Sequence, residues 1–312
     1  MIALLLTKQI LSMYIFLIMG AVLVKRGILQ KKDGNVLALI SLYVLLPCTI
    51  INAFRIEYSN EVRNNFLLSF LMAFLVQLLM FILCAVIEKV LHLTVIENAS
   101  LFYTNAGNLI FPIVSAVLGE EMLMYVSSYL CVQMLWLWTY GNNRIKGENS
   151  LSLKGAIQAI RNPNFLAVLV GMIIFFFRIP LPDTIDMALT SGSRAIASIS
   201  MLQIGMILAD VDFRKALTSA RLYLMVVLRM IVIPLICLVF MWLCPLAKYT
   251  ELGKALFLPI FLAACAPSAV VISQLAMLHG QDDEHAGMIN AVTTLVCIVT
   301  MPVLAMLYMR GM

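Results

Sequence analysis

The stretch YTNAGNLIFPIVSAVLG, residues 103–119, interrupts an apolar run of membrane-spanning length with Asn105, Gly107, Asn108 and Pro112. Proline removes a backbone donor and its ring clashes with the preceding helical turn. Glycine and asparagine lower the helix propensity further. We therefore expect the helix over 97–118 to break between residues 104 and 112.

A second stretch, LAACAPSAV at 262–270, has the same character, because Pro267 follows a run of small residues and precedes Ser268. Backbone freed inside a membrane must be paired or must line a wet cavity. Breaks at matching places in two halves of a chain indicate the central site of a transporter. The partial positive charge and free N–H groups of half-helix N-termini suit an anion.

The composition around these stretches is that of a membrane protein. Of 312 residues, 63% are hydrophobic and 12% charged, and the mean hydropathy is +1.01. A soluble domain carries about a quarter charged residues, and so much apolar surface is not tolerated in water. The net charge of +5 comes from scattered basic residues, which report orientation and predict no nucleic-acid partner.

Ten apolar segments approach the ~20 residues that a helix needs to cross the hydrocarbon layer. The longest polar connection, 141–162, divides the segments into five and five, so we predict a first five-helix repeat at 1–140, a central cytoplasmic loop at 141–162 and a second repeat at 163–312. The segments are 4–24, 36–54, 65–87, 97–118, 122–140, 163–180, 187–209, 222–244, 254–277 and 286–309.

Lys and Arg are more frequent in the odd-numbered loops than in the even loops and the termini. This bias predicts a multi-pass protein of the inner cell membrane, with both termini outside and the central loop cytoplasmic. Because five helices are an odd number, the second unit is inverted relative to the first. FLIMGAVLVKRG (16–27) is weakly similar to LVGMIIFFFRIP (169–180), and chance similarity between apolar segments stays the alternative.

Four motifs carry a resemblance to a known family. YTNAGNLIFPIVSAVLGEE (103–121) and AACAPSAVVISQLAMLHGQDDEHAG (263–287) resemble the fourth-helix and ninth-helix motifs of the auxin efflux carrier family. RNPNFLAVLVGM (161–172) and LRMIVIPL (228–235) are similar to its sixth and eighth helices. Residues 108–111 depart from the family, which often has smaller residues there, so the pocket shape stays open.

The resemblance implies an all-α integral membrane protein with ten transmembrane helices in two inverted five-helix repeats. Helices four and nine would be broken and would cross at the centre. The architecture would be related to that of PIN-type auxin carriers and bile-acid sodium symporters. The compact bacterial kind fits, since the chain lacks a large central loop. Members carry organic anions, namely auxin in plants and malonate- or malate-like dicarboxylates in bacteria.

The candidate substrate-binding residues gather at the two breaks, with one cation added from the eighth segment. Arg229 costs ~3 kcal/mol at membrane depth, which favours a functional role, although its long side chain can also reach the interface. The same two interpretations, a functional role or a side chain that reaches the membrane interface, apply to Arg194. Inter-helix hydrogen bonding is the alternative for Ser273 and Gln274, the candidates for a coupling ion. The substrate candidates are Asn105, Asn108, Pro112, Ala266, Pro267, Ser268 and Arg229.

These observations predict a secondary transporter that moves a small organic anion by alternating access around the two breaks. The alternative is a sensor or receptor that binds its ligand there without transport. An enzyme is disfavoured, because the spans contain no acid–base set. We expect no metal and no cofactor, and we interpret the loop 279–285 as a solvated acidic cap. Coupling to Na⁺ or H⁺, the direction of transport and a homodimer stay open.

Overall fold

The computed structural model describes residues 2–148, 157, 160–209 and 218–311. Helices dominate this part of the chain, and it contains no β-strand beyond one isolated bridge. Six helical stretches in it are long and apolar enough to cross a membrane: Thr7–Lys25, Gly34–Ala53, Asn60–Leu91, Glu120–Ile145, Ala220–Leu243 and Asp283–Arg310. The chain is therefore an all-helical, multi-pass membrane protein. Residues 149–156 and 158–159 of the predicted central loop lie outside the described residues.

The first half contains two helices with internal changes of winding and one that is interrupted. Its helices are α1 (Ile2–Lys25), η1 (Lys31–Asp33), α2 (Gly34–Ile40), η2 (Ser41–Leu45), α3 (Leu46–Ala53), α4 (Asn60–Leu91), α5 (Val95–Phe102), η3 (Ala106–Ile110), α6 (Phe111–Leu118), η4 (Glu120–Met122), α7 (Leu123–Trp136), η5 (Leu137–Gly141) and α8 (Asn142–Ile145).

The second half also contains an interrupted helix. Its helices are α10 (Pro163–Phe177), α11 (Asp183–Leu208), α13 (Ala220–Val227), η6 (Leu228–Val232), α14 (Ile233–Leu243), η7 (Pro245–Tyr249), η8 (Gly253–Phe257), α15 (Leu258–Ala264), α16 (Val270–Leu278) and α17 (Asp283–Arg310).

Three prolines follow π-helical turns inside helical stretches that continue past them. Pro47, Pro112 and Pro234 each lie two residues after a π-helical turn, η2, η3 or η6. A proline cannot donate to the carbonyl four residues back, and the wider turn lets the neighbouring N–H groups pair five residues back instead. The expected break between residues 104 and 112 is therefore shorter than predicted, because helix resumes at Ala106 and Pro112 lies inside the continuous helix Ala106–Leu118.

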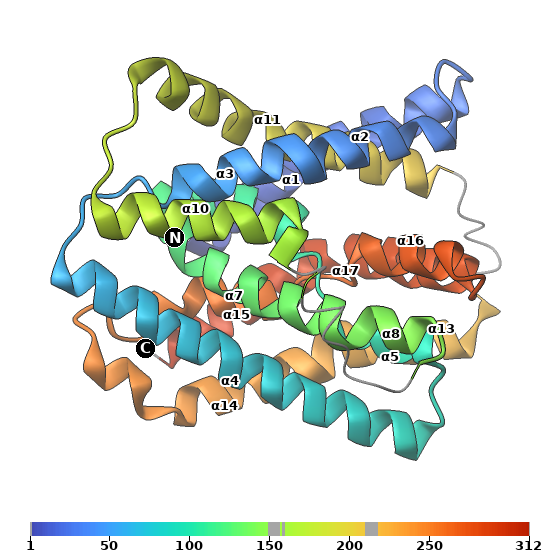
Figure 1. Ribbon diagram of the computed structural model, residues 1–312. Helices are drawn as coiled ribbons and strands as arrows, with labels where there is room; N and C mark the ends of the chain where they lie inside the picture. The colour runs from blue at the N-terminus through green and yellow to red at the C-terminus, as the bar shows by residue number, and fades with distance from the viewer. Residues whose placement is uncertain (1, 149–156, 158–159, 210–217, 312) are drawn as a thin grey trace.

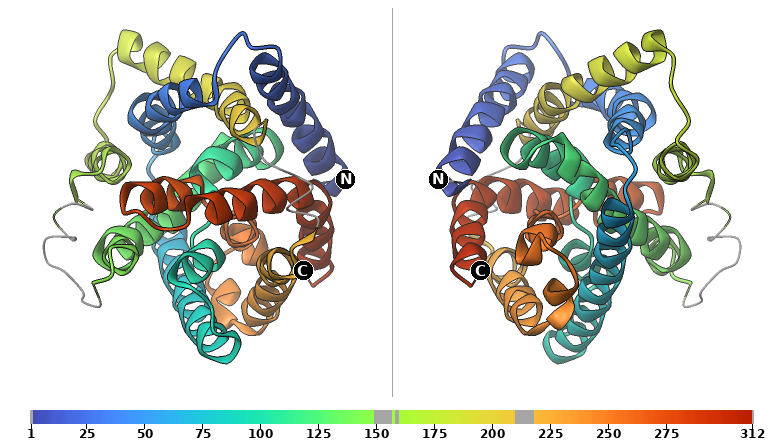
Figure 2. Two further views of the ribbon diagram at one scale, coloured as in Figure 1. Left: turned by 90° about the vertical axis from the view of Figure 1, so that its right-hand side faces the viewer. Right: turned by 90° about the vertical axis from the view of Figure 1, so that its left-hand side faces the viewer.

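The helices form two groups, which Figures 1 and 2 show on opposite sides of the molecule. We call α1, α2, α3, α10 and α11 the side bundle. We call all the other helices, including the short ones, the crossing bundle. The most extensive helix pairing is that of α1 with α11 in the side bundle. A Cβ atom at Gly20 would overlap the Leu202 carbonyl, and one at Gly205 would overlap the Leu17 carbonyl. Small residues thus let two backbones meet closely, as in other membrane helix pairs.

Candidate functional site

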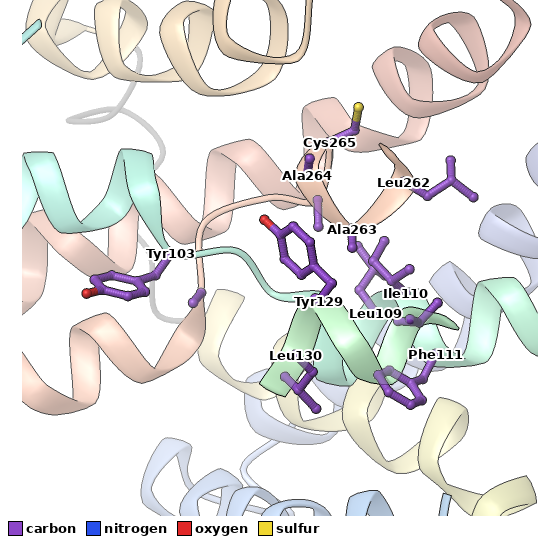
Figure 3. Close-up of a cluster of buried hydrophobic side chains, with 14 of the residues drawn as sticks. Tyr103, Leu109, Ile110, Phe111, Tyr129, Leu130, Leu262, Ala263, Ala264 and Cys265 are labelled. Carbon is purple, nitrogen blue, oxygen red and sulfur yellow. The ribbon is translucent and has the colours of Figure 1, made fainter. Parts of the chain in front are cut away.

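Two helices of the crossing bundle are interrupted where they meet. In the first half, α5 ends at Phe102 and helix resumes at Ala106. In the second half, α15 ends at Ala264 and α16 begins at Val270. Apolar side chains of both helices and of α7 pack around the meeting point (Figure 3). Four half-helix ends therefore lie together inside the protein.

The two interrupted segments pair with each other as a short antiparallel bridge between Thr104 and Ser268. Backbone groups that leave a helix inside a membrane need another partner, and here each segment supplies it to the other. The two bonds run from Asn105 N to the Pro267 carbonyl (2.9 Å) and from Ala269 N to the Tyr103 carbonyl (3.0 Å).

Side chains satisfy the outer edges of this bridge. Gln133 of α7 accepts from Thr104 N (3.1 Å) and donates to the Thr104 carbonyl (2.8 Å). On the other side, Thr293 Oγ1 of α17 accepts from Ser268 N (3.2 Å) and Asn290 donates to the Ser268 carbonyl (2.5 Å). The last helix of each half thus supports its own half of the bridge in the same manner.

Arg229 holds the carboxyl ends of the broken helices. Its guanidinium is fully buried and donates to the carbonyls of Leu101 (3.0 Å), Ala264 (2.9 Å) and Ala266 (3.1 Å). A cation at a helix C-terminus compensates the negative end of the helix dipole. Arg229 therefore fastens α5 to α15, and it does not line the cavity described next.

A cavity of about 260 Å³ lies beside the same bridge, where the helices η3 and α16 begin. The side bundle and the crossing bundle both contribute to its wall. Among the described residues that line it, every polar side chain is an uncharged amide or hydroxyl. These are Asn35, Thr104, Asn105, Asn108, Gln133, Asn164, Gln203 and Gln274.

Two helix N-termini reach this cavity without a side-chain cap. Asn105 precedes η3 and Ala269 precedes α16, and neither position provides a capping hydrogen bond. The Asn105 side-chain nitrogen is also buried without a partner. The first N–H groups of a helix lack intrahelical acceptors, so both helix starts attract negative charge.

The structure separates the predicted site residues into three sets. Asn105, Asn108 and Gln274 line the cavity. Ala266, Pro267 and Ser268 are buried in the extended segment and shape the crossing through their backbone. Pro112 is buried in α6, Ser273 donates to the Val270 carbonyl (2.8 Å), and Arg194 is exposed on α11.

Ionic contacts tie the crossing bundle together near the start of α5. Arg221 pairs with Glu97 (2.6 Å), and His285 Nε2 lies 3.3 Å from the same carboxylate. Arg144 pairs with Glu88 (2.5 Å). Within the described residues, no group of three His, Cys, Asp or Glu side chains has the geometry to hold a metal ion.

Sequence reasoning missed Asn164 and Asn35 as cavity residues. Asn164 follows Asn162 and Pro163 at the start of α10, and such a pattern is that of an ordinary helix cap. Nothing in it indicates that the helix start faces a cavity.

A family model described as "Membrane transport protein" matches residues 5–305. A search of curated proteins gives no match.

Proposed function

The chain belongs to the membrane transport protein family, the auxin efflux carriers, and on this premise we propose that it is a secondary transporter of a small organic anion. One observation carries the proposal: two uncapped helix N-termini meet at a cavity whose described polar lining is uncharged. An anion there gains N–H donors and the positive ends of two dipoles. It meets no carboxylate among the described lining residues.

Asn105 and Asn108 are the side chains we assign to the substrate. Both line the cavity, and both lie at or just after the start of η3. The buried side-chain nitrogen of Asn105 has no protein partner, so a carboxylate oxygen would satisfy it. A buried donor left unpaired costs about 1–3 kcal/mol, which makes binding of an acceptor group favourable.

We further propose ten transmembrane helices in two inverted five-helix repeats. The six long apolar spans are supplemented by the shorter apolar helices Ala106–Leu118, Pro163–Phe177 and Gly253–Ala264. Adding α11, a 26-residue helix, completes the count. The shared support of the bridge, by Gln133 in one half and Asn290 in the other, favours two copies of one unit.

The cavity lies between the two bundles, so a relative movement of the bundles would change its access. The side chains of Asn35, Leu39 and Met277 are exposed at its mouth. Asn35 and Leu39 follow the loop that carries Lys25, Arg26, Lys31 and Lys32, which we assign to the cytoplasm. Met277 precedes the loop 278–285, which has no Lys or Arg and takes its side from the proposed order of the ten helices. We therefore propose an inward-open state of the inner membrane, and an elevator-like or rocking exchange with an outward-open one.

The experiment is flux into proteoliposomes of a panel of monocarboxylates and dicarboxylates, including malonate, malate and auxin. Each acid is measured with and without Na⁺ and pH gradients. We expect saturable uptake of at least one acid, and a loss of about tenfold in apparent affinity for Asn105→Ala, because one buried hydrogen bond to a charged group is removed. Binding without flux would favour a sensor. Flux that is unchanged in Asn105→Ala would show that Asn105 at the crossing does not bind the substrate.

A further inference from the structure

The cavity has a second polar wall, formed by the side bundle rather than by the crossing. Asn164 on α10 is 1% exposed, and neither its side-chain nitrogen nor its side-chain oxygen has a partner. Gln203 on α11 is equally buried, and its side-chain oxygen is also unpaired. Both residues line the cavity. Buried polar groups in native proteins are nearly always paired, so these atoms indicate a ligand group that faces them.

The two walls differ in the charge that they accept. At the start of α10, the Asn162 side chain already accepts from Asn164 N (2.9 Å), so this helix N-terminus is capped. The starts of η3 and α16 carry no such cap. The crossing thus keeps free N–H donors for an anion, whereas the second wall has given one of its backbone donors to a protein oxygen.

The second wall also presents acceptors together with donors. Each amide side chain carries one oxygen that accepts and one nitrogen that donates, and this holds for either orientation of the amide. A second carboxylate could accept from the amide nitrogens, but at this wall it would meet neither an uncapped helix N-terminus nor a cation among the described lining residues, so the loss of its hydration would be poorly compensated. A hydroxyl or a carboxamide donates and accepts, and it would satisfy both side chains.

From these two walls we infer that the substrate is a monocarboxylate whose far end carries an uncharged hydrogen-bonding group. The carboxylate lies at the crossing, and Asn164 and Gln203 hold the neutral group. This inference rests on the proposed function and names the substrate class of the same cavity. The volume of about 260 Å³ suits a small acid, since pockets for drug-sized ligands begin at about 300 Å³.

The test uses four acids on one carbon chain, with binding measured by calorimetry on the purified full-length protein. Propionate, 3-hydroxypropionate, malonamate and malonate share three carbons and differ only in the far group. We expect 3-hydroxypropionate and malonamate to bind roughly tenfold more tightly than propionate, as one or two buried hydrogen bonds allow. Malonate is expected to bind no more tightly than propionate. If the flux panel selects a longer acid, the same four end groups are compared on that chain.

The variants assign the preference to residues. Asn164→Ala and Gln203→Leu should each reduce the preference for 3-hydroxypropionate over propionate to about twofold or less. Asn105→Ala should weaken all four acids and leave the preference near tenfold, because it acts on the carboxylate. The matched control is Asn64→Ala, which removes an exposed amide outside the cavity.

Each remaining outcome overturns a defined part of the proposal. Tightest binding of malonate, or an Asn164→Ala variant that keeps the tenfold preference, overturns the neutral end group while the transporter proposal stands. An equal loss of all four acids in Asn164→Ala and in Gln203→Leu would show a structural role only, and would also overturn it. The absence of both binding and flux for every acid in the two panels would overturn the proposed function, and this inference with it.

Discussion

Replacing Arg229 by methionine tests whether this cation fastens the crossing or binds the substrate. The change leaves the carbonyls of Leu101, Ala264 and Ala266 without their donor in a fully buried place. An unpaired buried acceptor costs about 1–3 kcal/mol, so three acceptors cost about 3–9 kcal/mol. Removal of a desolvated charge returns several kcal/mol of this cost. We therefore expect a net loss of about 3 kcal/mol in the free energy of unfolding.

The assay is thermal unfolding in detergent. It is monitored as the loss of the monodisperse peak in size-exclusion chromatography after heating. A loss of about 3 kcal/mol corresponds to a fall in Tm of roughly 5 °C for 312 residues, at about 2.1 cal/mol/K of unfolding entropy per residue. Arg229→Lys should also lower the Tm, since an ammonium group cannot reproduce the planar fork that meets three carbonyls. Arg161→Met, at an exposed arginine, is the matched control and should leave the Tm within about 2 °C.

Two results would refute this reasoning. A Tm of Arg229→Met equal to that of the control would show that the three carbonyls do not depend on the guanidinium. A large loss of carboxylate affinity with an unchanged Tm would return Arg229 to the substrate, as the sequence alone suggested. The structure favours a fastening role for Arg229, because its donors meet carbonyls at the C-terminal ends of α5 and α15 and in the segment that follows α15.

Two further predictions concern the bridge and the orientation of the chain. Gln133→Leu removes the bonds to both backbone groups of Thr104, so we expect a lower Tm and about tenfold weaker carboxylate binding. Gln77→Leu is its control, because Gln77 donates to the Tyr129 carbonyl outside the cavity and should lower the Tm alone; equal affinity losses in both variants would contradict a specific role of Gln133. Asn35→Cys, in a variant without the seven native cysteines, should react with a membrane-impermeant maleimide in inside-out vesicles, and labelling of right-side-out vesicles instead would reverse the proposed orientation.

The sequence predicts the interruptions but not their cause. Low helix propensity at 104–108 and the small residues before Pro267 indicate two weak points. The first break nevertheless ends at Asn105 and leaves Pro112 in helix, because a π-helical turn absorbs the missing donor. What opens the helix at Thr104 is backbone pairing with the extended segment 267–269. Propensity within one segment contains no information about a partner more than 150 residues away.

Arg229 and Asn164 show the same limit for side chains. A charge at membrane depth is visible in the sequence as unusual and costly, but the sequence does not say whether it meets a ligand or a backbone carbonyl. Asn164 is ordinary in the sequence, since polar residues are common at helix starts. Its importance follows only from burial without a partner, which depends on how α10 packs against the cavity.

The two walls of the cavity constrain how a carrier of this kind can work. Asn105 and Asn108 belong to the crossing bundle, whereas Asn164 and Gln203 belong to the side bundle. A ligand that contacts both walls holds the bundles together, and a movement between the bundles must break one set of contacts. Binding energy from the far group therefore stabilises the loaded state without lowering the barrier to exchange, unless the moving state replaces those contacts. For the substrate class proposed above, the neutral group would select the substrate, while the carboxylate would stay bound to the crossing bundle during the proposed exchange.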